Sequence, residues 1–167
     1  MLILRFFFAL ACLVLVACQI TTSPGIKGMP TLPVTSASFA QSPDILFETA
    51  KLVCDAPNEQ FVQLTQDIVQ CRMVMPPKST ANAILQYDGT IHDLPRIVIS
   101  FQRMKLKERY VVSTCTFLMV PKKTGGIARV AYRDRVLEQR MEQVLAKAGG
   151  ARLRTPEPQS TIACYST

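Results

Sequence analysis

The apolar and polar positions divide the chain into a leading apolar run, a segment without periodicity and a longer patterned region. Residues 6–16 are all apolar. This run is shorter than the roughly 20 apolar residues that a membrane-spanning helix needs, and it falls within the roughly 7–15 residues typical of a secretory signal. Residues 18–43 are rich in Pro, Ser and Thr, which predicts a flexible linker. We expect residues 44–167 to form a single domain.

Three stretches of the patterned region have the spacing of an amphipathic helix: residues 44–56, 79–87 and 135–148. The third prediction is the best supported, because Asp134 is a good N-cap and Gly149 supplies a stop. Its apolar stripe consists of Leu137, Met141, Val144, Leu145 and Ala148.

Alternating apolar residues predict strands at residues 67–75, 95–107, 108–120 and 127–132. The second and third follow each other directly, so we expect a long hairpin. Residues 58–65 fit either a helix or a strand. The apolar residues expected to share a face are Ile97, Ile99 and Phe101 in one strand of the hairpin and Val111, Cys115, Phe117 and Met119 in the other.

The expected order of elements, α-β-α-β-β-β-α, indicates an α+β fold. We expect an antiparallel sheet of about four strands with helices packed on one face, including the C-terminal amphipathic helix. The other face would then meet solvent or a partner.

The end of the leading apolar run carries a recognisable motif, Leu15-Val16-Ala17-Cys18. It resembles the lipobox of bacterial lipoproteins, and the resemblance covers residues 1–18 only. It implies a signal peptide at residues 1–17 and acylation of Cys18, with palmitate-type chains as the membrane anchor. Because Gln19 rather than Asp follows, the resemblance favours the outer membrane, facing the periplasm. Residues 9–12 are a poorer match, and a plain secretory signal is the other alternative.

The cysteines beyond the signal predict disulfide bonds, because an exported domain meets an oxidising compartment. Of the three possible pairings we favour Cys54–Cys71 with Cys115–Cys164. The first is local, and the second would fix the C-terminal tail. A zinc site is the alternative, but no C-x-x-C spacing supports it.

Positive charge is concentrated in the second half of the chain. The whole sequence has a formal charge of +7, and the stretch from Arg96 to Arg154 holds 14 basic and four acidic residues. Basic residues at alternate positions predict a ridge that attracts an anionic envelope polymer or an acidic partner protein. Nucleic acid is not expected in that compartment. The ridge residues are Arg103, Lys105, Lys107 and Arg109, extended by Lys122 and Lys123.

The search for catalytic residues gives one weak candidate. His92 is the only histidine, and with Asp88 and Asp93 it offers a base or part of a metal site. The simpler interpretation is a turn at Asp88 and Gly89. A K-T-G sequence at residues 123–125 occurs in penicillin-binding proteins, but the S-x-x-K and S-D-N elements that accompany it there are absent from the sequence.

The sequence therefore favours a membrane-anchored envelope lipoprotein that acts as a non-enzymatic binding or scaffolding module, within a multiprotein envelope assembly. We expect no cofactor and no metal. The alternative is an envelope hydrolase or carbohydrate-active enzyme that uses Asp88, His92 and Asp93.

Overall fold

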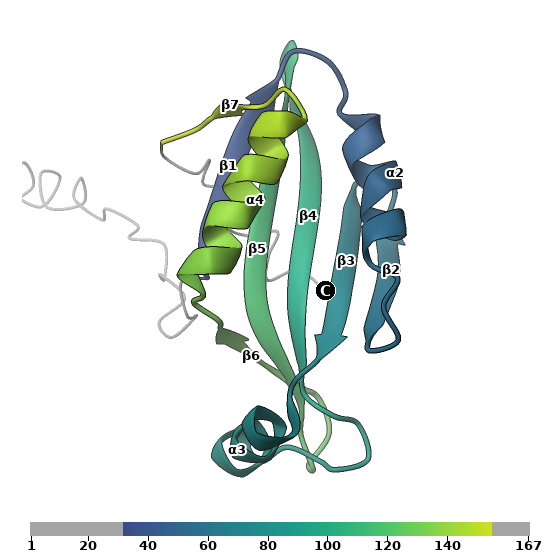
Figure 1. Cartoon of the computed structure of the whole chain (residues 1–167), viewed down its shortest axis with the longest axis vertical. Coiled ribbons are helices and arrows are strands. Elements are labelled where there is room, and N and C mark those ends of the chain that lie inside the picture. Colours follow the sequence, from purple (N-terminus) through teal and green to yellow (C-terminus); the bar gives the residue numbers. More distant parts are fainter. Residues whose placement is uncertain (1–31, 155–167) are drawn as a thin grey trace, which may run out of the picture.

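The computed structural model describes residues 32–154, which contain seven strands and three helices (Figure 1). In chain order these are β1 (Val34–Phe39), α2 (Asp44–Val53), β2 (Glu59–Thr65), β3 (Ile68–Val74), α3 (Pro77–Tyr87), β4 (Arg96–Leu106), β5 (Arg109–Pro121), β6 (Ile127–Ala131), α4 (Arg135–Lys147) and β7 (Ala151–Arg152). None of these helices combines the length and the apolar character needed to cross a membrane.

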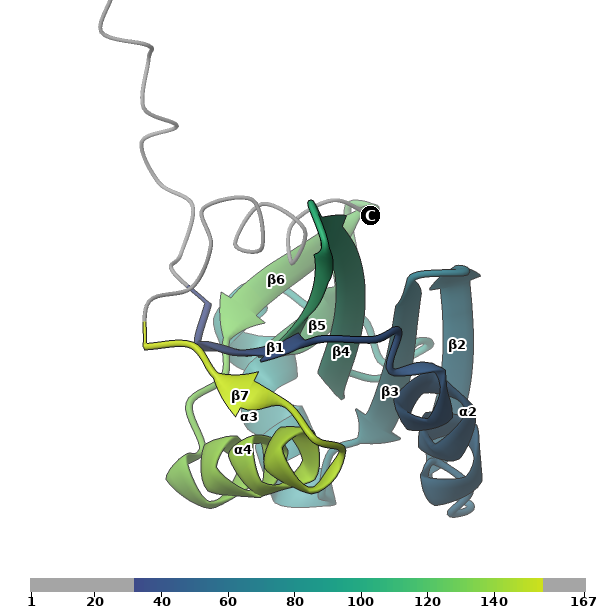
Figure 2. The ribbon, with the colours of Figure 1, turned by 90° about the horizontal axis from the view of Figure 1, so that it is seen from above.

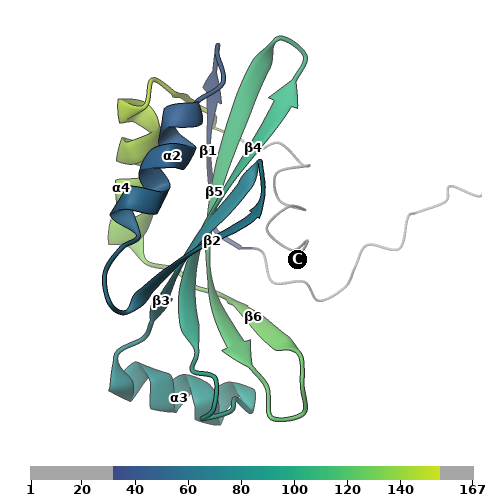
Figure 3. The ribbon, with the colours of Figure 1, turned by 90° about the vertical axis from the view of Figure 1, so that its right-hand side faces the viewer.

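The strands of the described range form one antiparallel sheet in the order β2-β3-β4-β5-β1-β7. The long strand β5 has β4 along one edge. Its other edge is shared by β1, which pairs with residues 110–115, and β6, which pairs with residues 117–121. The prediction of about four strands with helices packed on one face is therefore wrong: the sheet has seven strands, and α3 lies across one end of it (Figure 3). The fold is still a mixture of helices and strands.

Two of the additional strands come from segments that the sequence pattern did not assign to a strand. β1 lies inside the predicted linker, so the linker prediction is wrong for residues 34–39, and the domain begins before residue 44. Small polar residues suit β1 because it lies between β5 and β7, where the buried hydroxyls of Ser36 and Ser113 are hydrogen-bonded at 2.9 Å. β2 is the segment that the sequence left open between helix and strand.

Helices α2 and α4 lie on the same face of the sheet (Figures 2 and 3). Leu46 of α2 and Leu145 of α4 belong to one buried cluster, which also contains Val112 of β5. At the end of the sheet, Ala83 of α3 packs with Leu118 of β5 in a separate cluster. One buried cluster therefore lies beneath α2 and α4, and another lies where α3 packs against the end of the sheet.

Strand β5 is buried on both faces. On the face opposite α2 and α4, its residues Phe117 and Met119 pack with Leu32 and Val98. The expected pair of long strands is confirmed, and three residues predicted to share a face of β5, Cys115, Phe117 and Met119, belong to one buried cluster. Burial on both faces explains why the sequence of β5 contains hardly any charge.

The helix ends follow local rules. The side chain of Asp134 accepts hydrogen bonds from the backbone N–H groups of Val136 and Leu137 at 2.9 and 3.1 Å, which confirms the predicted cap of α4. Helix α3 begins at Pro77, two residues earlier than predicted, because the fixed φ of proline fits the first helical turn.

A disulfide bond joins Cys54, at the end of α2, to Cys71 of β3, with a Cα–Cα distance of 5.7 Å. The local pairing predicted from the sequence is confirmed. Cys115 is also disulfide-bonded, and Cys164, the partner that the sequence favours for it, lies outside the described residues. Cys18 lies outside them too.

Candidate functional site

The three candidate catalytic residues lie in or beside the loop that follows α3. The carboxylate of Asp88 lies 3.5 Å from the ammonium group of Lys123, and that of Asp93 lies 3.5 Å from the guanidinium group of Arg96. His92 is exposed, and its backbone N–H donates to the hydroxyl of Thr90. None of the three lines the apolar cleft between α2 and α4. Each carboxylate thus has a cation as its partner, and the geometry gives no convergence of the two on His92.

The predicted basic ridge is divided by the structure. Lys105, Lys107 and Arg109 lie at the tip of the β4–β5 hairpin, whereas Lys122 and Lys123 follow the other end of β5. A strand of this length spans about 40 Å. The six residues therefore do not form one surface.

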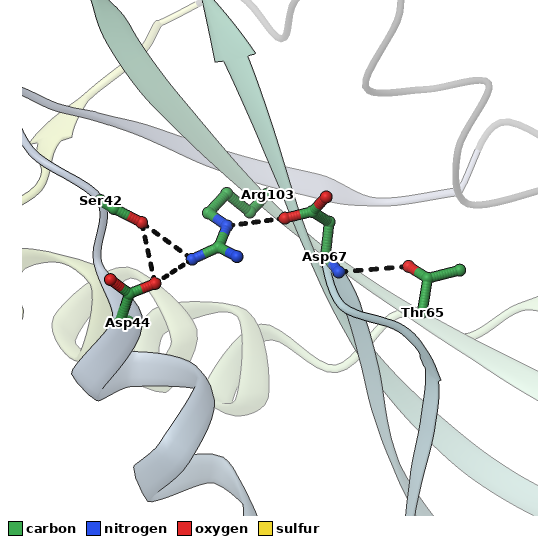
Figure 4. A network of polar contacts seen from close by, with 5 residues as sticks. All are labelled: Ser42, Asp44, Thr65, Asp67 and Arg103. Atoms are coloured by element: carbon green, nitrogen blue, oxygen red, sulfur yellow. Dashed lines mark hydrogen bonds and ion pairs between the residues drawn. The ribbon is translucent and has the colours of Figure 1, made fainter.

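The remaining ridge residue, Arg103, is engaged inside the domain (Figure 4). Its guanidinium group donates to the carboxylates of Asp67, at 2.8 Å, and Asp44, and to the hydroxyl of Ser42. The group also lies 5.0 Å from the centre of the Phe47 ring, and only 9% of the side chain is exposed. Arg103 therefore joins the start of α2, the β2–β3 turn and β4, and is not available to a partner.

The same network shifts two pKa values. The hydrogen bond from Ser42, followed by that from Arg103, lowers the pKa of the Asp44 carboxyl below its ordinary value. Burial opposes the charge of Arg103, but the hydrogen bonds to Asp67 and Asp44 outweigh it and raise the pKa of the guanidinium group. The contacts therefore favour the ionised form of both partners.

An apolar cleft lies between α2 and α4, above strands β2, β3 and β4, with a volume of about 190 Å³. Its surface is almost entirely hydrocarbon. Two methionines and two phenylalanines contribute to it, and methionine side chains adapt readily to what they contact. The main lining side chains are Leu46, Val53, Phe61, Val69, Met73, Ile99, Phe101, Met141 and Val144.

The two walls of the cleft differ in character. On α2, Val53 lines the cleft while 75% of its surface is exposed, so the apolar surface continues out of the cleft. On α4, exposed Arg140 and Lys147 are seven residues apart and flank Met141 and Val144 along the same side of the helix. The cleft is thus apolar inside and has positive charge along one rim.

The disulfide bond lies at the edge of this cleft. The Cys54 and Cys71 sulfurs and a carboxylate oxygen of Glu59 lie within 4.8 Å of one another, a spacing that would suit a metal ion. The two sulfurs are bonded to each other, so they are not thiolate ligands. Here the cysteines hold the end of α2 against β3 and so fix one wall of the cleft.

Sequence reasoning missed the cleft. Its residues come from two helices and three strands that are far apart in the chain. The one available signal was Val53 on α2, an apolar residue beyond the stripe that a single buried face requires.

Comparisons with known proteins give little guidance. No family model matches the chain, and no solved structure matches it. A valine dehydrogenase from Streptomyces albus is 29% identical over 103 residues, which are 59% of this chain and 27% of that protein. The chain thus matches only about a quarter of the length of that relative.

Proposed function

We propose that the chain is a membrane-anchored lipoprotein of the bacterial cell envelope that binds or scaffolds a partner protein through the cleft between α2 and α4. The lipobox-like motif that ends at Cys18 supports the anchor, with acyl chains of the palmitate type. The same motif favours the outer membrane and the periplasm. Binding, and not catalysis, is the proposed activity, within a multiprotein envelope assembly.

The observation that carries this proposal is the cleft itself. Its volume of about 190 Å³ is below the roughly 300–1,000 Å³ of sites for drug-sized ligands, and slightly above a cavity that accepts benzene. This size suits one or two apolar side chains. Such anchor residues, buried in a pocket, supply most of the affinity of a protein interface.

The charges at the rim of the cleft indicate which partner residues lie beside the apolar side chain that the cleft binds. Arg140 and Lys147 are exposed on the α4 side. Charge complementarity therefore favours a partner segment with an apolar anchor residue and acidic neighbours. An acidic protein is preferred over an anionic polymer, because a polymer of charged units has no apolar group to fill the cleft.

Two substitutions test the cleft. In Val53→Glu and Met141→Glu, a carboxylate replaces an apolar group of the lining, and we expect at least about a tenfold loss of partner binding from the cost of burying that charge. A photo-crosslinking residue placed at position 53 of the anchored protein in cells should give a partner adduct that the Met141→Glu substitution removes.

Leu52→Glu is the matched control, because Leu52 is the neighbour of Val53, is 78% exposed and does not line the cleft. It should bind as the wild type does. Equal crosslinking from positions 52 and 53, or binding unaffected by Met141→Glu, would rule out the cleft as the interface.

The anchor has a separate test. A Cys18→Ser variant should not mature normally, and it should not be retained as a processed form in the membrane fraction after a high-salt wash. Normal maturation and retention would contradict the lipoprotein assignment, whatever the cleft binds.

A further inference from the structure

In the part of the chain that the structure describes, most of the exposed large hydrophobic side chains lie either on α2 or at one end of the molecule. Of eight such residues, three lie on α2 and one at the start of α4. The other four lie at the end of the molecule where α3 is found, which we call the α3 end (Figures 1 and 3). These four are Leu85, Ile91, Leu94 and Ile127, with exposures of 82%, 70%, 39% and 53%.

Backbone hydrogen bonds hold the parts of the α3 end together. The N–H of Thr90 donates to the carbonyl of Pro121, and the N–H of Lys123 donates to the carbonyl of Asp88, each at 3.0 Å. The loop after α3 and the β5–β6 turn are therefore neighbours. Exposed Lys122 and Lys123 lie in that turn, and Lys123 is 3.5 Å from the carboxylate of Asp88, so the apolar side chains have an excess of positive charge beside them.

Three arginines add to this charge from the sheet face opposite α2 and α4. Arg96 of β4 and Arg129 of β6 both pair with Met119 in the strand register, and Arg72 of β3 pairs with Val98. Met119 and Val98 both belong to the buried cluster of that face. Because Met119 lies two residues before the end of β5, Arg96 and Arg129 lie within about 7 Å of the α3 end.

The arginines make a concentrated positive site. Burial, and then the nearby charges of Arg96 and Arg129, lower the pKa of Arg72 below its ordinary value. Arg96 donates to Gln60 and Asp93, but its Nε is buried and has no hydrogen-bond partner. Anionic oxygens at the exposed part of the Arg96 guanidinium group would offset the mutual repulsion of the arginines.

The chain enters the domain closer to the α3 end than to the hairpin tip. Leu32 packs in the same cluster as Phe117. Phe117 is four residues from Pro121 but eight from Arg109, which corresponds to about 13 Å against about 26 Å along β5. Residues 19–31, the part of the proposed tether that precedes the domain, span at most about 45 Å when fully extended.

We propose that the α3 end rests on an anionic membrane surface. Ile91, Leu94 and Ile127 enter the headgroup boundary, while the arginines and the turn lysines contact lipid phosphates. The tether part of this inference rests on the proposed function. The hairpin tip is the less suitable end, because none of the eight exposed hydrophobic residues belongs to residues 104–110, whereas four belong to the α3 end. The hairpin tip then lies farthest from the membrane.

Amide hydrogen exchange of the lipid-anchored protein in vesicles tests this orientation. Phosphatidylcholine vesicles are compared with vesicles that contain about 30% phosphatidylglycerol. With the anionic lipid we expect exchange in residues 88–94 and 122–128 to slow by at least about threefold, and exchange in residues 104–110 to stay the same. About 0.5 M NaCl should reverse much of the slowing. Equal exchange in the two kinds of vesicle, or protection of the hairpin tip, would overturn the proposal.

Paired variants identify the side chains responsible. Ile91→Ser with Ile127→Ser should abolish the protection, whereas Ile45→Ser with Leu52→Ser, at positions on α2 that are also more than half exposed, should leave it intact. Arg96→Gln with Arg129→Gln should reduce the protection given by the anionic lipid. Protection that both serine pairs leave unchanged would count against contact through the α3 end.

Two further experiments distinguish a membrane contact from binding of a soluble anion, and from failure of the tether. Inorganic phosphate added to the protein in phosphatidylcholine vesicles should not reproduce the protection. If it does, the arginines bind a soluble anion and the membrane contact is wrong. Failure of the tether is seen separately, in the Cys18→Ser fractionation, while failure of the contact is seen as unchanged exchange in protein that is still anchored.

Discussion

At the scale of single residues, Arg103 has a different role in the structure from the one that its sequence pattern predicts. Alternate spacing placed it correctly on one face of β4, but spacing does not reveal that Asp44 and Asp67 converge on it from other elements. The sequence predicts a cation that can bind a partner, whereas in the structure Arg103 links α2, the β2–β3 turn and β4 through hydrogen bonds.

Replacing this residue should lower stability. We expect Arg103→Ala to reduce the free energy of unfolding by about 1–3 kcal/mol, less than for a fully buried ion pair because both carboxylates are largely exposed. Lys105→Ala, two residues along the same strand and face, is the control and should cost less than about 0.5 kcal/mol. Denaturant unfolding at neutral pH measures both values.

The pH dependence of this effect has a definite sign. The pKa of Asp44 is lowered in the folded state, so its contribution is complete above the ordinary carboxyl range and is lost as the pH falls through the folded pKa. The stability difference between wild type and Arg103→Ala should therefore be largest near pH 7 and decrease below about pH 4. A difference that grows with acid would contradict the ion-pair explanation.

At the scale of elements, the connection from α4 to β7 depends on a close approach of the backbone. A Cβ at Gly150 would lie 2.6 Å from the ring of Phe39 and 2.8 Å from the side chain of Ala37. Helix α4 reaches β1 only because this position has no side chain. In the sequence, Gly150 looks like part of the glycine stop that follows α4, and the local pattern does not reveal its contact with β1.

Gly150→Ala should therefore cost about 1–3 kcal/mol of stability, through displacement of α4 and β7 from β1. Gly126→Asn is a suitable control: that position has a φ of +78° with open space around it, and asparagine tolerates this conformation. Unfolding of the two variants should differ by at least about 1 kcal/mol. Similar losses at both positions would show that the close approach does not matter.

Local rules predicted the elements that depend on neighbouring residues. The cap at Asp134 and the alternation of β4 and β5 are confirmed, because both act over a few positions. β1 was missed because Ser36 and Thr35 look like linker residues until β5 supplies their partners. The cleft was missed for a similar reason, since Val53 and Met141 meet only in the folded chain.

At the scale of the whole molecule, the disulfide bond affects the unfolded chain as well as the cleft. The bond closes a loop with a sequence separation of 17 residues. A Cys54→Ser, Cys71→Ser double variant should lose about 3 kcal/mol of stability, mainly through the added freedom of the unfolded chain. Denaturant unfolding checks this, and an unchanged midpoint would contradict it. Binding through the cleft should also weaken, because α2 is no longer held at Cys54.

The division of one edge of β5 between two partner strands has a consequence for how the domain opens. Thr116 lies between the segment paired with β1 and the segment paired with β6. The ladder on this side is interrupted there, so β6 can detach without breaking any bond between β5 and β1. Local unfolding is therefore expected to begin at β6. The pairing of β1 with β5 would stay intact while β6 detaches.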